Sequence, residues 1–189
     1  IDFNSSDIEI INEDNRIIAN NAVATIKEDE IIIEGIKIEY LKDQSLIKVE
    51  KGNISKIDNS IKINSDIIEY DIKNSKIAFS GNVKIQENLK NLIIRSNKII
   101  YDVNRQIISS QNNSEILDDQ NNIYTVNKFE YSIIEKIVKL QNVKILDNRK
   151  NKFDTEIAYL DLEKKELVAK DIGLNFKPIE NSENEPRLK

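Results

Sequence analysis

A period of about 30 residues runs through the sequence and limits the folds that this chain can adopt. Tyrosines mark it with separations of 30, 31, 30 and 28 residues, at Tyr40, Tyr70, Tyr101, Tyr131 and Tyr159. A second marker, a glycine or asparagine followed by an apolar residue, keeps the same period at Asn21, Gly52, Gly81, Asn142 and Gly173. Two markers with one period predict six repeated units, starting near residues 1, 31, 61, 92, 122 and 151.

Within a unit, apolar residues alternate with polar ones, as in a β-strand with one apolar face. In the third unit one alternating run ends near residue 72, "KNSK" at 73–76 reads as a tight turn, and a second run follows it. Ile61 and Ile63 alternate in the opposite parity to Ile68 and Tyr70. This switch predicts a bulge or corner near Ser65, where the strand bends.

Composition agrees with strands, because isoleucine occupies 37 of the 189 positions and β-branched residues favour a pleated, half-buried surface. Each unit can bury its apolar face only by stacking on its neighbours. We therefore predict an all-β domain over residues 1–176, with about 12 antiparallel strands in two facing sheets. Residues 177–189 hold both prolines and no apolar period, which predicts an exposed linker.

Two segments also fit the apolar stripe of a helix. In one, the apolar positions run from Val126 to Leu140, and in the other Phe153, Ile157 and Leu160 precede the helix-prone "EKKELVAK". Tyr131 and Tyr159 keep the repeat phase in these segments, so strands are predicted in both.

Residue types that are missing exclude several functions. The chain has no histidine and no cysteine, which excludes Ser-His-Asp and Cys-His catalysis and the common zinc sites. Its net charge is −5 and its lysines are scattered, so a nucleic-acid partner is not expected. The acidic clusters at 28–30 and 118–119 would suit a metal or an acid/base pair, but such clusters are usually solvated turns. We therefore expect that the chain is not an enzyme and that it holds no metal or cofactor.

Because the chain begins at Ile1 and lacks methionine, we interpret it as a piece of a longer precursor.

The stacked apolar faces leave two alternatives. Either the sheets close and their side chains fill the core, which periodicity alone favours, or they splay along one edge and leave an apolar groove. The repeated tyrosines would then be core anchors, or they would lie at the groove mouth with the ring inward and the hydroxyl in water. We favour the second interpretation of the tyrosines.

The stretch "INSDIIEYDIKNSKIAFSGNVKI" resembles the repeat of the OstA-like family of lipopolysaccharide-transport proteins, in which a polar triplet precedes a tyrosine strand and "GNV" closes the next strand. The ending "NEPRLK", residues 184–189, is similar to the hinge before the outer-membrane barrel of LptD-type members. The matching positions of this chain are Asn64-Ser65-Asp66, Tyr70 and Gly81-Asn82-Val83 and, less fully, Ser96-Asn97, Tyr101, Asn142-Val143 and Tyr159.

The resemblance implies the N-terminal periplasmic domain of an LptD-type protein, a β-taco or open β-jellyroll with the LptA/LptC-like fold. Such a domain receives lipopolysaccharide from an LptA-like bridge protein, which would add a strand at the N-terminal edge, residues 1–30. It passes the acyl chains along an apolar groove to the outer-membrane barrel, and the missing barrel would bind an LptE-like lipoprotein. The implied location is the periplasm, attached to the outer membrane.

The groove-lining residues predicted on this basis are Ile61, Ile63, Ile68, Tyr70, Ile72, Ile77, Phe79, Val83, Ile85, Tyr101, Val103, Tyr131 and Tyr159. Two departures from the family pattern are the absence of cysteine, which puts disulfide-controlled assembly in doubt, and the lack of a clear "GNV" in the fourth unit. The alternatives are an LptA-like soluble bridge protein and a structural β-repeat domain without a ligand.

Overall fold

The fold consists of β-strands in a computed structural model that describes residues 1–13, 15–89, 91–170 and 173–175. Within these ranges the only helical element is the 3-10 turn η1 (Lys42–Gln44), and no helix is long and apolar enough to cross a membrane. The strands are β1 (Asp2–Asn4), β2 (Asp7–Ile11), β3 (Arg16–Ile26), β4 (Ile31–Leu41), β5 (Leu46–Lys56), β6 (Ile61–Asp71), β7 (Lys76–Glu87), β8 (Leu92–Asp102), β9 (Ile107–Ser110), β10 (Ser114–Leu117), β11 (Ile123–Val126), β12 (Lys128–Ser132), β13 (Ile137–Leu146), β14 (Lys152–Asp161), β15 (Glu166–Lys170) and β16 (Gly173–Asn175).

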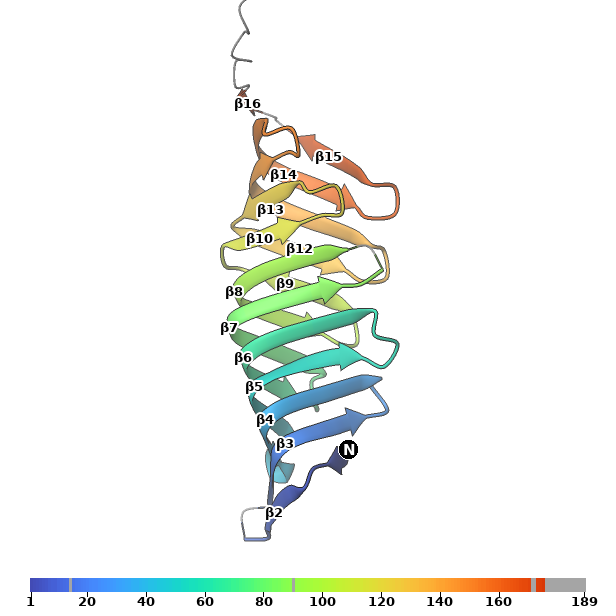
Figure 1. Ribbon diagram of the computed structural model, residues 1–189, viewed down its shortest axis with the longest axis vertical. Coiled ribbons are helices and arrows are strands. Elements are labelled where there is room, and N and C mark those ends of the chain that lie inside the picture. The colour runs from blue at the N-terminus through green and yellow to red at the C-terminus, as the bar shows by residue number, and fades with distance from the viewer. Residues whose placement is uncertain (14, 90, 171–172, 176–189) are drawn as a thin grey trace, which may run out of the picture.

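The strands follow one another up a tall, narrow stack with a second layer behind the first (Figure 1). From β3 to β8 each strand pairs antiparallel with the next one in the chain. The prediction of an all-β antiparallel fold is confirmed. The prediction that the two segments with helix-like stripes form strands is also confirmed, since β11 to β15 cover residues 123–170. The described residues form one 16-stranded sheet, with more strands than the 12 predicted, partly because the second half of the weak fourth unit is divided into the short strands β9 and β10, and the first half of the fifth unit into β11 and β12.

Each long strand bends at its middle, and in all of them except β7 the bend changes which residues point inward. In β6, Ile61 and Ile63 are buried before the bend and Ile68 and Tyr70 after it. The register shifts between Asn64 and Ile67, so the predicted bulge is confirmed. The two halves of a long strand therefore lie in different layers, and both layers turn their apolar side chains to one interior.

Buried hydroxyl groups stabilise the bends. The Ser65 hydroxyl donates to the carbonyl oxygen of Ser80 at 2.8 Å and accepts from the Ile67 amide at 3.3 Å. Thr155 occupies the corresponding place in β14, where its hydroxyl lies within hydrogen-bond distance of the carbonyl oxygens of Ile157 and Lys170. These bonds satisfy backbone groups that a bulge removes from the strand ladder, which explains the polar triplet of the repeat.

The backbone is left-handed at bends of alternate strands. Gly81 has φ +75°, and the neighbouring Asn82 has φ +46°. Asn21, Lys51 and Asn142 adopt the same region at the bends of β3, β5 and β13. Glycine and asparagine reach this region at low cost, so the second sequence marker records the bends.

The turns also end on left-handed residues, and alternate turns stack on the same side of the molecule. The Ile57 amide donates to the Glu30 carbonyl oxygen at 2.9 Å on one side, and the Val103 amide donates to the Ser75 carbonyl oxygen at 2.9 Å on the other. We name the two stacks by the left-handed residue that ends each turn. Turn edge A comprises the turns ending at Glu30, Asn59, Asn91, Asn121 and Lys150, and turn edge B those ending at Asn15, Ser45, Ser75, Gln106, Lys136 and Lys165.

We expect Gly52→Ala to destabilise the fold, because a Cβ at this position would lie 2.2 Å from the Glu34 carbonyl oxygen of the paired strand. The backbone would have to shift, at a cost of about 1–3 kcal/mol, and urea unfolding should show a lower midpoint. Gly173→Ala is the control, since its Cβ would meet nothing closer than 3.7 Å. Equal midpoints for the two variants would contradict the close approach at the bend.

Candidate functional site

A row of tyrosines lies along the inner face of the layer that ends at turn edge B. Cross-strand pairing places Tyr40, Tyr70, Tyr101 and Tyr131 in one line, with a single isoleucine between each two. We call these four residues the tyrosine row. The line continues through Val138 to Leu160, so it extends from β4 to β14.

Most of the predicted groove-lining residues lie together in this interior. Eleven of the thirteen are buried, with exposed fractions from 0% to 7%. Ile72 is partly buried and packs against the same core. The buried ones are Ile61, Ile63, Ile68, Tyr70, Ile77, Phe79, Val83, Ile85, Tyr101, Val103 and Tyr131. Their position inside the molecule agrees with the sequence analysis, while their contact with a lipid stays a prediction.

The placement of Tyr159 in this lining is wrong. Tyr159 is 43% exposed and lies beside Lys139 and Val168 on the outer face of β14, where the Lys139 ammonium is 6.0 Å from its ring centre. Leu160 takes the inner position instead. Tyr159 follows Tyr131 by 28 residues, whereas the inner position, Leu160, follows it by 29. A shift of one residue moves a side chain to the opposite face of a strand.

The interior is closed along most of its length, in agreement with the filled alternative. Among the residues that the structure describes, side-chain contacts join the two turn edges across the gap between them, which we call the mouth. The Tyr70 hydroxyl bonds to the Asp29 carboxylate, and Lys165 bonds to Asp119. Lys136 Nζ lies 3.5 Å from an oxygen of Glu87, a carboxylate that is fully buried on the inner face of β7.

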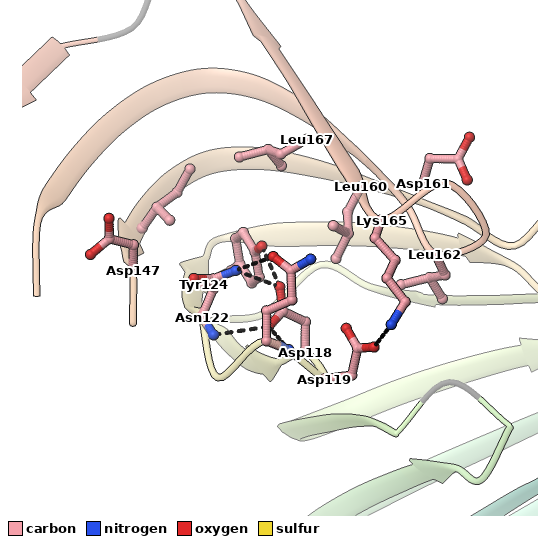
Figure 2. Close-up of a pocket in the computed structure, with 12 residues that line it drawn as sticks. Asp118, Asp119, Asn122, Tyr124, Asp147, Leu160, Asp161, Leu162, Lys165 and Leu167 are labelled. Atoms are coloured by element: carbon pink, nitrogen blue, oxygen red, sulfur yellow. Dashed lines mark hydrogen bonds and ion pairs between the residues drawn. The ribbon is translucent and has the colours of Figure 1, made fainter. Parts of the chain in front are cut away.

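A cavity of about 140 Å³ opens at the C-terminal end of the mouth. Figure 2 shows Tyr124, Leu160, Leu162 and Leu167 around it, with the Lys165–Asp119 ion pair at its rim. A cavity of about 150 Å³ holds one benzene molecule, so this one has room for the end of a single acyl chain. A lipid with several acyl chains needs the layers to separate.

The acidic clusters have structural partners. Asp118 accepts from the amides of Gln120 and Asn122 at 2.9 and 2.8 Å and from the Tyr124 hydroxyl at 2.7 Å. Asp119 and Asp29 each bond across the mouth. No group of three or more acidic residues that could hold a metal occurs within the described ranges. The clusters lie in turns, as expected, but Asp118 is buried and not solvated, and Asp119 and Asp29 have mouth contacts that the sequence analysis did not predict.

Three tyrosines of the row, Tyr70, Tyr101 and Tyr131, are buried, so the expectation that their hydroxyls lie in water is wrong for these three. Burial raises the pKa of Tyr101 to about 12, and the carboxylates of Asp29, Asp102 and Asp58 add to the shift. Burial, followed by the nearby Glu87, also raises the pKa of Tyr131. These hydroxyls therefore keep their protons at neutral pH and can donate hydrogen bonds.

Sequence reasoning missed the mouth contacts because their partners are 41 to 49 residues apart in the chain. No local pattern joins Asp29 to Tyr70, or Glu87 to Lys136. The repeat held the necessary signal, since alternate turns must lie on opposite edges of a stack of bent strands. Polar residues in turns of opposite edges were therefore candidates for contact across the mouth.

Comparison with known proteins gives one family and one fold. Residues 33–148, more than half of the chain, match the family model described as lipopolysaccharide-assembly, LptC-related. Among solved structures, the chain is similar to LptH from Pseudomonas aeruginosa, the LptA-homologous periplasmic component of the lipopolysaccharide transport device. The TM-score is 0.54 and the identity 16%, over 62% of this chain and 95% of LptH, so this likeness shows the fold alone. No curated protein matches the chain.

Proposed function

The chain belongs to the LptC-related family of lipopolysaccharide-assembly proteins, and from this premise we propose that it binds lipopolysaccharide in the periplasm and conducts its acyl chains through the interior. It is a component of lipid transport and not an enzyme, as expected from its residue types. The observation that carries the proposal is the continuous apolar interior, whose inner rows pass without interruption from β3 to β14.

The interior suits acyl chains in its chemistry. Its buried side chains are mainly isoleucines, with valine, leucine and the tyrosine rings. Transfer of a methylene group from water to such surroundings is worth about 0.8 kcal/mol. Contact of this kind has no direction, so a chain can slide from one repeat to the next. Sugars and phosphates would remain outside the mouth.

Conduction requires the two layers to separate along the mouth. On the bend side the layers are joined by continuous strands and their hydrogen bonds. On the mouth side, the side-chain contacts described above join the turn edges. Opening about the bends therefore breaks fewer bonds than any other separation of the layers. We propose that lipid enters by this movement.

Two components of the transport system fit this role. The family match supports a bridge-type member of the LptC and LptA kind better than the N-terminal domain of an LptD-type protein. We therefore propose the bridge-type role. Attachment to the outer membrane and an LptE-like partner depend on the LptD interpretation and stay predictions. The C-terminal linker and its hinge, residues 177–189, lie outside the described residues, as does the domain boundary at 176.

Incorporation of a photo-crosslinking phenylalanine analogue at Phe79 in cells should give a lipopolysaccharide adduct, because this side chain is buried in the interior. The matched control is Ile100 on the neighbouring strand, which is 37% exposed and lies on the outer face. Adduct is measured as a lipopolysaccharide-reactive band of lower mobility. Equal signals at the two positions, or none at Phe79, would refute the proposal.

A bridge across the mouth should block binding. The chain has no cysteine, so Asp119→Cys together with Lys165→Cys provides two thiols at a contact between the turn edges. A cleavable thiol crosslinker should abolish lipopolysaccharide binding, and cleavage should restore it. Lys48→Cys with Glu69→Cys is the control pair, since these residues face each other on adjacent strands of one layer. If binding persists with the mouth bridged, lipid does not enter there.

The N-terminal edge is the proposed contact with an LptA-like bridge protein. β1 and β2 both pair only with β3 among the described strands, so their outer sides can accept a strand from another chain. Ile8 and Ile10 are 43% and 60% exposed there. We expect Ile10→Lys to abolish crosslinking to the partner and Ile36→Lys, a site at the bend of β4 that is 54% exposed, to preserve it. Retained crosslinking in Ile10→Lys would count against this edge.

A further inference from the structure

Two buried hydroxyls of the tyrosine row lack a partner. In the part of the chain that the structure describes, no hydrogen bond reaches the hydroxyl oxygen of Tyr101 or of Tyr131. Tyr70, in the same row, bonds to Asp29, and Tyr124 bonds to Asp118. A buried polar group without a partner is destabilising, and native proteins rarely keep one without reason. These two hydroxyls therefore need an explanation that the fold does not provide.

The two hydroxyls belong to a regular arrangement. Tyr101 and Tyr131 flank Ile108 in the sheet, which places them two strand spacings, roughly 10 Å, apart. Tyr70 shows the direction of the row, because its hydroxyl reaches Asp29 on turn edge A. The row therefore presents two parallel donors at the boundary between the apolar interior and the mouth.

The surrounding charge indicates what these donors can bind. The carboxylates of Asp29 and Asp58 act on Tyr101, and that of Glu87 acts on Tyr131. The ammonium of Lys136 is held by Glu87. A phosphate would be repelled by these carboxylates, since like charges in a partly buried site are unfavourable. A neutral acceptor such as a carbonyl oxygen meets no such penalty.

We propose that Tyr101 and Tyr131 donate hydrogen bonds to the ester or amide carbonyl oxygens at the head of acyl chains that occupy the interior. This inference rests on the proposed lipid-binding function and assigns its specificity residues. The apolar rows then hold the methylene chain, and the two hydroxyls fix the depth at which the polar end of the chain stops. The cost of the two hydroxyls in the empty protein is recovered when lipid binds.

Removal of the two hydroxyls should weaken lipid binding without lowering the stability of the fold. In Tyr101→Phe with Tyr131→Phe, the urea midpoint should be unchanged or higher, because a buried group without a partner is gone. The dissociation constant for lipid A should rise about three- to tenfold for each hydroxyl. Tyr159→Phe, the same change on the outer face, should alter neither quantity. Unchanged affinity in the double variant, with normal binding by the unaltered chain, would overturn this inference and leave the proposed function intact.

The choice of lipid tests the acceptor. The unaltered chain should bind an ester-linked acylated disaccharide more tightly than its ether-linked analogue, and the double variant should lose this preference. The loss caused by the double variant should be the same for lipid A and for its dephosphorylated form. A loss confined to the phosphorylated lipid would overturn the carbonyl assignment. Absence of binding by the unaltered chain to every lipid would refute the proposed function itself, and the inference with it.

Discussion

The fold depends on the bend in each long strand. A straight strand of 11 residues would carry its apolar side chains on one face only, and a single layer of such strands would leave that face in water. The bend lets both halves of a strand face the same interior. In β6 it does so by a shift of the alternation by one residue at Ser65, and in β7 by two left-handed residues, Gly81 and Asn82, without a change of parity. Because the main chain of each long strand continues through the bend, the two layers stay joined on that side even when they separate at the mouth.

The two sides of the interior differ in the kind of bond that holds them. Strand ladders cross the bends, whereas the mouth is joined by side chains of the two turn edges. Exposed ion pairs contribute little to stability, and a buried pair such as Glu87–Lys136 offsets much of its own attraction by the loss of hydration. An interior held in this way is closed along most of its length, and it has one side on which separation of the layers is least costly. This asymmetry is what a carrier of acyl chains requires.

The sequence predicted the strands and the inner faces because both follow from a period of two and a longer repeat. Ile68, Tyr70, Ile77 and Phe79 are buried as their alternation implies. Tyr159 departs from the prediction because the parity of its strand, and not its residue type, decides on which face its side chain lies. The mouth contacts were not predictable from local pattern, since they join turns that only the three-dimensional stack brings together. Composition also does not predict whether the two apolar faces pack against each other or leave a groove. That outcome depends on the angle between the two halves of each bent strand.

Because each central strand pairs with its neighbours in the chain, the length of the stack depends on the number of units. One unit of about 30 residues adds two strands, or roughly 10 Å of length, and it makes new contacts only with the unit beside it. Units can therefore be gained or lost without redesign of the others, as in other repeat proteins. The length of such a stack is thus set by the number of its units, in steps that evolution can take one at a time.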